Sequence, residues 1–202
     1  LCIDSFTPLN SKLHKGLEAT LSVTHEAICQ YLEGSSVYAL ARPPGHHSSE
    51  STYGGYSYYN FTALSAQALS EHGTVAILDI DFHHGNGTQD IFYKRDDVFT
   101  MSIHADPQKH FPYTGYENEL GEAQGFGFNK NYVLADNSTI DTYEKVLIQA
   151  LEEMRIFKPD YIVIPFGVDT YTNDPLGSFN IEVSVSCGVA VLKSSSVGVL
   201  VF

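Results

Sequence analysis

The stretch VAILDIDFHHGNG at residues 75–87 decides the fold of this 202-residue chain. Its first four residues form an uninterrupted apolar run, as expected for a strand buried on both faces of a parallel sheet. Polar side chains begin at Asp79, where that strand should end. Apolar runs of the same kind occur at residues 37–41, 98–103 and 161–164. The sequence therefore predicts several buried strands, one of which leads directly into a cluster of acidic and histidine side chains.

Helical patterns separate these runs. Residues 62–72 predict a helix that Gly73 stops, and the apolar spacing over residues 140–154 predicts a second helix. Ser138 or Thr139 could cap that second helix, and Pro159 ends it. Alternating strands and helices are typical of an α/β fold with a central, mostly parallel sheet flanked by helices. In such sheets, sites form at the carboxyl ends of the strands.

Composition limits the function classes. The chain is 43% hydrophobic and 17% charged, which favours a globular domain. Its net charge of −13 argues against a nucleic-acid partner, because such binding needs Lys and Arg against phosphates. An acidic surface suits cationic substrates, although it more often reflects solubility alone. Scattered cysteines (Cys2, Cys29 and Cys187) and the absence of a membrane-length apolar run predict a cytoplasmic protein with no membrane partner.

Three polar clusters follow three of the predicted strands: His46-His47, the residues from Asp79 to His84, and Asp169. On an extended backbone, residues two apart point to the same side, so Asp81 and His83 can bind one ion. Asp169 would be a third ligand from another strand. Three protein ligands with an open position form the arrangement of catalytic zinc. The alternative is that these side chains only cap turns. The large number of Asp and His residues at strand ends favours a metal site instead.

The adjacent His46 and His47 could form a second metal site, a surface pair or a catalytic pair. Beside a metal, one imidazole can act as a base and the other as an electrostatic aid. Each ring then needs an acceptor on its second nitrogen. Asp79 and Asn86 are available for that role.

Several blocks together resemble the histone deacetylase superfamily in order and spacing over about residues 7–180. They are RPPGHH (42–47), YGGY (53–56), DIDFHHGNG (79–87), SIH (102–104), GVD (167–169) and DPLG (174–177). The residues around Asn86 and Phe111 are most similar to acetylpolyamine amidohydrolases and bacterial histone deacetylase-like amidohydrolases.

The resemblance implies an arginase/deacetylase-like fold with one catalytic Zn²⁺ and structural K⁺. It assigns the zinc ligands to Asp81, His83 and Asp169, and the catalytic residues to His46, His47, Asp79 and Asn86. His47 would be the general base, and because Asn86 carries no full charge, His47 should be less basic than in members with Asp there. It implies a substrate tunnel lined by Gly55, Tyr56 and Phe111. It places one potassium site at Asp79, Asp81, His83, Ser102 and Ile103, and another near Phe92, Arg95, Val98 and Phe128.

The activity implied is hydrolysis of an acetyl amide, in an acetylpolyamine or acetyl-lysine, to a free amine and acetate. A homodimer is also possible by this resemblance. The family closes its site with a tyrosine in a Gly-Gly-rich turn, which this sequence lacks. Residues 181–202 instead form an atypical tail without a helix or strand pattern, so residues 1–202 are expected to be a single partial domain, incomplete at both ends.

Two other functions remain open. The first is an inactive or truncated deacetylase-like remnant that acts, if at all, as a binding module. The second is an arginase-type di-manganese ureohydrolase, which would need more Asp ligands than the sequence offers and which the RPPGHH block (42–47) does not favour.

Overall fold

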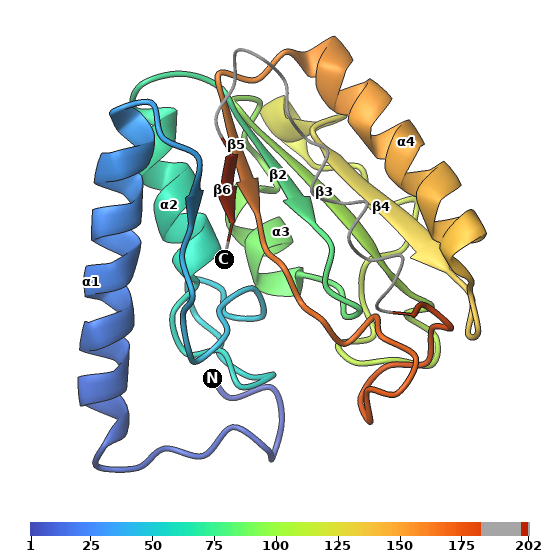
Figure 1. Ribbon diagram of the computed structural model, residues 1–202, viewed down its shortest axis with the longest axis horizontal. Helices are drawn as coiled ribbons and strands as arrows, with labels where there is room; N and C mark the ends of the chain where they lie inside the picture. Colours follow the sequence, from blue (N-terminus) through green and yellow to red (C-terminus); the bar gives the residue numbers. More distant parts are fainter. Residues whose placement is uncertain (183–198, 202) are drawn as a thin grey trace.

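A computed structural model describes residues 1–182 and 199–201 as a parallel sheet flanked by helices (Figure 1). Its elements in chain order are α1 (Leu13–Leu32), β1 (Val37–Tyr38), α2 (Phe61–Ser70), β2 (Val75–Asp79), α3 (Asn86–Phe92), β3 (Val98–Ala105), a short 3₁₀ helix (Ala123–Gly125), β4 (Asn129–Leu134), α4 (Ile140–Phe157), β5 (Tyr161–Ile164) and β6 (Val199–Val201). The strand order is β1-β6-β5-β2-β3-β4, and every neighbouring pair is parallel. The α/β prediction is therefore confirmed. No helix in this described part of the chain is both long and apolar enough to cross a membrane.

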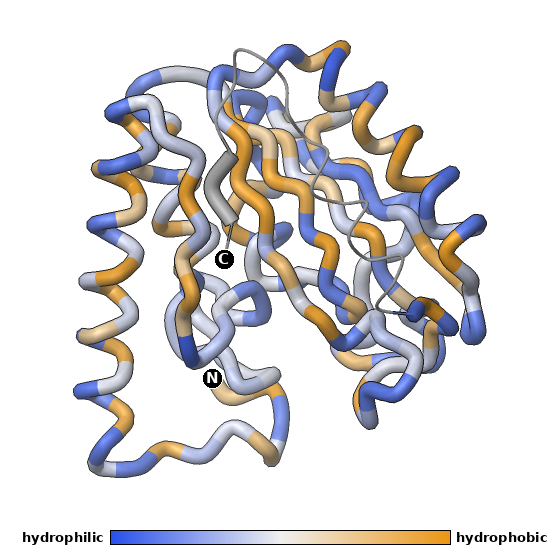
Figure 2. The backbone as a smooth tube through the Cα atoms, in the orientation of Figure 1, coloured by the Kyte–Doolittle hydropathy of each residue, from blue (hydrophilic) through white to orange (hydrophobic). Residues whose placement is uncertain are grey.

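The sheet has a hydrophobic core on each face, because alternate residues of its strands point to opposite sides. In β2, Val75 and Ile77 pack with α1, α2 and α3, whereas Ala76 and Leu78 pack on the side covered by α4. All five residues of β2 are buried. Figure 2 shows the same pattern as a band of hydrophobic backbone through β5, β2 and β3. The carboxyl ends of these strands are consequently held at fixed positions.

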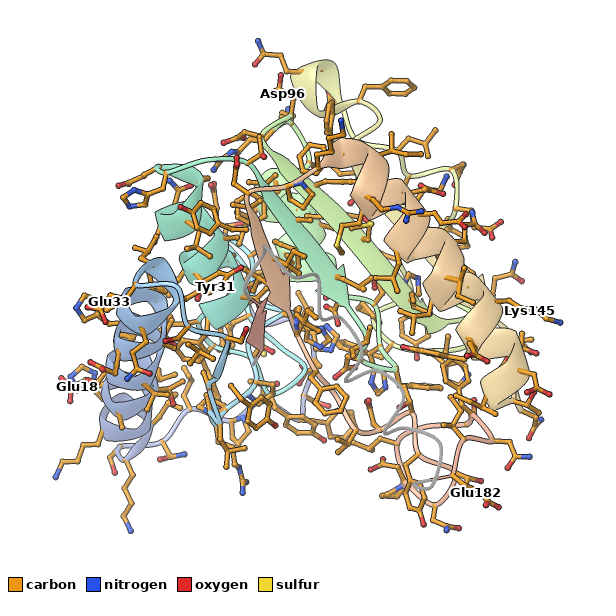
Figure 3. All side chains as sticks on the ribbon, turned by 45° about the horizontal axis from the view of Figure 1, so that its top comes forward. Glu18, Tyr31, Glu33, Asp96, Lys145 and Glu182 are labelled. Atoms are coloured by element: carbon orange, nitrogen blue, oxygen red, sulfur yellow. The ribbon has the colours of Figure 1, made fainter. Side chains whose placement is uncertain are left out.

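Helix α1 was not recognised in the sequence. In the structure Tyr31 points from α1 into the molecule, whereas Glu18 and Glu33 point outward (Figure 3). The Tyr31 hydroxyl accepts a hydrogen bond from the backbone N–H of Ile162 at 2.9 Å. Helix α1 is therefore joined to β5 at the centre of the sheet.

Several predicted boundaries were wrong. Strand β1 stops at Tyr38 rather than residue 41, because the chain leaves the sheet towards Pro43-Pro44, which lack the N–H groups of a ladder. Helix α2 ends at Ser70 rather than residue 72, where the Leu69 carbonyl closes a tight turn with the N–H of His72.

The prediction for the cap of α4 was right in position but wrong in its hydrogen bonding. Thr139 holds the capping position without a side-chain bond, and the Ser138 hydroxyl donates instead to the Ala135 carbonyl. The tail prediction fails at residues 199–201, which form β6, while residues 183–198 and 202 lie outside the described residues.

Candidate active site

Two neighbouring strands bring the three candidate metal ligands together. Asp81 and His83 follow β2, and Asp169 follows β5, which pairs with β2 in parallel. One potential ligand atom from each side chain lies within 4.8 Å of the other two. His83 Nδ1 is 2.8 Å from Asp169 Oδ2 and 3.4 Å from Asp81 Oδ1. All three side chains therefore face one point at the carboxyl edge of the sheet.

Backbone groups fix the orientation of both carboxylates. The N–H of His83 donates to Asp81 Oδ1 at 2.8 Å, and the N–H of Phe82 donates to Asp169 Oδ1 at 3.0 Å. Gly167 lies so close that a Cβ there would collide with Asp81 and come within 2.9 Å of Asp169 Oδ1. The glycine of the GVD block is thus required for the two carboxylates to approach each other.

The donor set fits a divalent metal ion. Two carboxylates and one imidazole are suitable zinc ligands, and their side chains are only 15% to 18% exposed. Burial opposes charge on His83, but its hydrogen bonds to Asp169 and Asp81 outweigh burial and raise its pKa to about 9. Without a metal, a proton on Nδ1 is therefore held between the two carboxylates, in the position where a cation would bind. A metal ion at this point would displace that proton.

The two adjacent histidines lie beside this cluster and are both buried. Their ring centroids are 4.0 Å apart, and the His47 ring is 6.1 Å from that of His83. His46 Nδ1 lies 2.8 Å from Asp79 Oδ2, and His47 Nδ1 lies 2.8 Å from Asn86 Oδ1. Both oxygens are acceptors, so each Nδ1 donates and the orienting contacts predicted from the sequence are present.

The two imidazoles have opposite pKa shifts. Burial opposes charge on His46, but the Asp79 and Asp81 carboxylates outweigh it and raise the pKa of His46 to about 9. Burial, followed by repulsion from His46, lowers the pKa of His47 well below its ordinary value. At neutral pH the pair therefore contains one imidazolium and one neutral imidazole whose Nε2 can accept a proton.

The residues assigned to the substrate tunnel lie at differing depths. The Phe111 ring centroid is 4.9 Å from that of His47. Gly55 has a positive φ of 54°, and a Cβ there would collide with both His47 and Phe111. Tyr56 is about half exposed and follows Gly55 directly. Gly55 and Phe111 thus lie against the histidine pair, and Tyr56 lies nearer the solvent.

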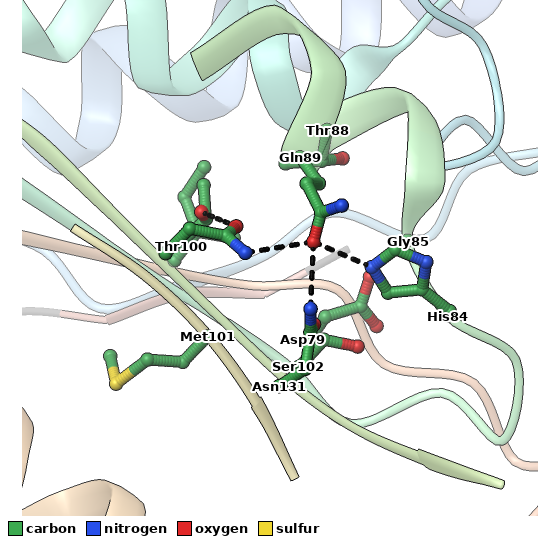
Figure 4. Close-up of a pocket in the computed structure, with 11 residues that line it drawn as sticks. Asp79, His84, Gly85, Thr88, Gln89, Thr100, Met101, Ser102 and Asn131 are labelled. Carbon is green, nitrogen blue, oxygen red and sulfur yellow. Dashed lines mark hydrogen bonds between the residues drawn. The ribbon is translucent and has the colours of Figure 1, made fainter. Parts of the chain in front are cut away.

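The residues of the first expected potassium site surround the end of β2. Asp79 is paired with Ser102 of β3, next to Ile103, and Asp81 and His83 follow in the loop. Asp79 and Ser102 line a small cavity of about 10 Å³ between these strands and α3 (Figure 4). Their oxygen atoms are the kind of donor that hard cations prefer. Potassium here stays a prediction.

The second expected set lies at the other end of the strands. Phe92, Arg95 and Val98 connect α3 to β3, and Phe128 precedes β4. The Phe92 carbonyl accepts from the N–H of Arg95, and the Phe128 carbonyl accepts from the N–H of Thr100. The Phe128 carbonyl also accepts from the Thr100 hydroxyl at 3.4 Å, and potassium at this second set stays a prediction.

A buried polar network that the sequence did not predict lies beneath the site. Gln89 Oε1 accepts hydrogen bonds from His84 Nε2 at 3.1 Å and from the Nδ2 atoms of Asn129 and Asn131 at 2.8 and 2.9 Å (Figure 4). Only the position of His84, directly after His83, pointed to it. The amides come from α3 and β4, and nothing in their local sequence indicates that they meet.

The comparisons with known proteins all point to the same family. The histone deacetylase domain matches residues 2–192. Acetylpolyamine amidohydrolase 1 of Pseudomonas aeruginosa is 43% identical over 183 residues, which cover 89% of this chain and 53% of that protein. This chain spans about half the length of the curated relatives it matches.

Solved structures agree with the sequence match. The crystal structure of acetylpolyamine aminohydrolase from Burkholderia pseudomallei aligns with a TM-score of 0.86 at 34% identity, covering 90% of this chain and 55% of that one. The HDA15 HD domain aligns with a TM-score of 0.90 at 26% identity, covering 98% and 59%. In both, the likeness extends over nine-tenths or more of this chain. The chain belongs to the histone deacetylase family.

Proposed function

We propose that this chain carries the catalytic residues of a zinc-dependent deacetylase that hydrolyses the acetyl amide of acetylated amines. The observation that carries the proposal is the convergence of Asp81, His83 and Asp169 beside a histidine pair with opposite pKa shifts. A metal site alone could be structural. The neutral His47 next to it supplies the base that a hydrolase needs.

Different residues of the chain would act in different steps of the reaction. A bound Zn²⁺ would polarise the acetyl carbonyl and lower the pKa of water in the site towards about 7. His47 Nε2 accepts the proton of the attacking water, because its Nδ1 is occupied by Asn86. The positive charge of His46, held by Asp79, stabilises negative charge that develops on the acetyl oxygen. An imidazolium of the pair then protonates the amine nitrogen as the C–N bond breaks.

The substrate class proposed is a small acetylated amine, with acetylpolyamines favoured over acetyl-lysine. Four of the similar curated proteins are named acetylpolyamine amidohydrolases, and the net charge of −13 suits a cationic substrate. Gly55, Tyr56 and Phe111 would enclose the methylene chain of the substrate. Their arrangement supports this, because Phe111 lies against His47 and Tyr56 lies further out.

Two measurements on one preparation test the proposal. Bound zinc is quantified per chain, and acetate release is followed with N-acetylputrescine and with an acetyl-lysine peptide. His47→Ala should retain the metal but lose roughly 10²–10⁴-fold in rate, the usual contribution of a general base. Glu18→Gln, which changes an exposed carboxylate on α1, is the matched control and should resemble the parent chain.

The outcomes separate the alternatives. A chain that binds no metal and releases no acetate contradicts the proposal. Metal binding without turnover would support the remnant or binding module instead. Two metal ions per chain would support the ureohydrolase; within the described residues, Asp81, His83 and Asp169 form the one group able to hold a metal, which supports a single ion.

A further inference from the structure

Asp136 joins two loops that approach the candidate site from different strands. It lies in the turn between β4 and α4. Its Oδ1 atom is 2.6 Å from His110 Nε2, in the loop after β3, and 2.6 Å from Ser178 Oγ, in the segment after Asp169. Lys109 Nζ lies 3.2 Å from the other oxygen. One carboxylate thus receives donors that are 26 and 42 residues away in the chain.

The first of these loops carries the aromatic wall of the site. His110 precedes Phe111, whose ring contacts His47 at a centroid distance of 4.9 Å. The His110 ring itself packs on Phe82 at 5.0 Å, and Phe82 contacts the His83 ring at 4.9 Å. A change in the position of His110 would therefore move Phe111 relative to the histidine pair.

The second loop supports the metal ligand Asp169. Gly177 lies against the Asp169 carbonyl with no room for a Cβ, and the buried Phe179 ring is 4.7 Å from Phe82. Ser178 lies between these two contacts. Two backbone hydrogen bonds run beside the carboxylate, from Asn137 N–H to the Ser178 carbonyl at 2.8 Å and from Asn180 N–H to the Ser138 carbonyl at 2.9 Å. The turn at Asp136 and the segment around Ser178 therefore form one unit.

The negative charge of Asp136 suits a residue that holds two loops together. The Ser178 hydroxyl and then His110 hold the pKa of Asp136 below its usual range, so the side chain is an acceptor only. Two donors on one ionised oxygen are stronger and more directional than neutral hydrogen bonds. Lys109 adds little, because more than half of its side chain is exposed and such ion pairs are weak.

We propose that Asp136 is a positioning residue that sets the Phe111 wall and the loop behind Asp169 relative to each other, and thereby shapes the substrate entrance. The effect on substrate binding rests on the proposed function. The effect on loop order does not, so the two can be tested separately.

Hydrogen exchange tests loop order directly. The N–H groups of His110 and Tyr113 bond within this loop, to the carbonyls of Asp106 and His110. Asp136→Asn should make these two amides exchange about 10-fold faster, because a charge-assisted hydrogen bond is lost. The amides of β2 should be unchanged. Asp97→Asn is the matched control, because Asp97 is also a partly exposed carboxylate in an ion pair, but its partner Arg95 lies at the opposite end of β3 from His110.

Kinetics and conservative variants complete the test. In Asp136→Asn, KM for the acetylated amine should rise about 10-fold, while kcat and bound metal stay within about threefold. Ser178→Ala should show part of this rise in KM. Ser178→Thr, which keeps the hydroxyl, should have the KM of the parent chain. Equal exchange of His110 and Tyr113 in Asp136→Asn and Asp97→Asn would overturn the proposal, as would uniformly faster exchange through β2. If the parent chain releases no acetate, the exchange result still decides this proposal, and the missing turnover counts against the proposed function alone.

Discussion

His47 donates its Nδ1 hydrogen to Asn86 Oδ1 across 2.8 Å, whereas the adjacent His46 donates to the Asp79 carboxylate at the same distance. One ring is therefore oriented by an uncharged amide and the other by an anion. Burial and repulsion from His46 lower the pKa of His47 despite its bond to Asn86, whereas the Asp79 and Asp81 carboxylates outweigh burial and raise the pKa of His46. His47 is consequently the ring of the pair that we propose as the proton acceptor.

Asn86→Asp should make His47 more basic. A carboxylate 2.8 Å from Nδ1 would stabilise the imidazolium and raise the pKa of His47. Because the base works in its neutral form, the acidic limb of the kcat/KM profile should move to higher pH by the same amount. An NMR titration of the His47 ring provides a readout independent of turnover. A profile and a titration that do not move would show that Asn86 does not control this ring.

Asp169→Asn should remove most of the metal affinity. One of three ligands loses its charge, and the loss should exceed the roughly 10–100-fold effect of changing a residue that only supports a ligand. Competition with a chelator measures it. Asp174→Asn is the control, since Asp174 lies on the same loop but bonds to the N–H of Leu176. Similar affinities in the two variants would contradict the assignment of Asp169.

Metal affinity should also depend on pH. His83 has a pKa of about 9 without metal, so at lower pH a metal ion must displace a proton. Apparent affinity should therefore increase about tenfold for each pH unit up to about 9 and then level off. Calorimetry in buffers of different ionisation enthalpy should detect close to one proton released per metal at pH 7. An affinity that is constant from pH 6 to about 9 would be inconsistent with His83 as a ligand.

Gly55→Ala should impair catalysis more than folding. Its Cβ would collide with the His47 and Phe111 rings, and a displacement of about 1 Å at the reacting groups can cost about 10²-fold in rate. The control is Gly34→Ala, which also has a positive φ but nothing within 4 Å of the added carbon. Both variants add backbone strain, and Gly55→Ala should lose more thermal stability because its new carbon must also displace the buried His47 ring. Equal activity of Gly55→Ala and Gly34→Ala would show that the space beside His47 and Phe111 does not limit catalysis.

His104→Gln should make the protein less sensitive to acid. His104 is fully buried, its Nε2 donates to the Gly115 carbonyl at 2.9 Å, and burial lowers its pKa to about 4. Between about 4 and the ordinary value of 6.5, the unfolded chain binds a proton that the folded one does not. Stability is therefore lost as pH falls through that window, by at most about 1.4 kcal/mol per unit. Urea unfolding at several pH values gives the free energy of unfolding as a function of pH. Its slope between about pH 4 and 6.5 should be smaller for the glutamine variant, and an unchanged slope would exclude His104 as a source of the acid sensitivity.

The strands and the convergence of the three candidate metal ligands could be predicted because their signal is local. Strand β2 is an unbroken apolar run, and its ligands follow within four residues of its end. The parallel order of the sheet then brings Asp169 to the same edge. Residues of one site that lie close together at the end of a strand leave a pattern that the sequence alone shows.

Other features have no such pattern. The buried face of α1 is formed by Leu17, Thr20, Thr24, Ala27 and Tyr31, so two of its five residues are polar and no apolar stripe stands out. Its capping residue, Lys12, makes no side-chain bond. Asp136 lies in an ordinary-looking turn, and its role depends on His110 and Ser178, whose positions only the folded chain defines.

The place of β6 in the sheet has a consequence for the order of assembly during synthesis. Within the described residues, β1 pairs with β6, through Val37 with Leu200 and Tyr38 with Val201. Strands β2 and β5 can associate as soon as residue 164 has left the ribosome, which completes the scaffold of the acidic cluster. The loop that bears His46 and His47 follows β1, whose partner is translated some 35 residues later. A nascent chain would therefore assemble the strands that bear the acidic cluster before β1 gains its neighbour in the sheet.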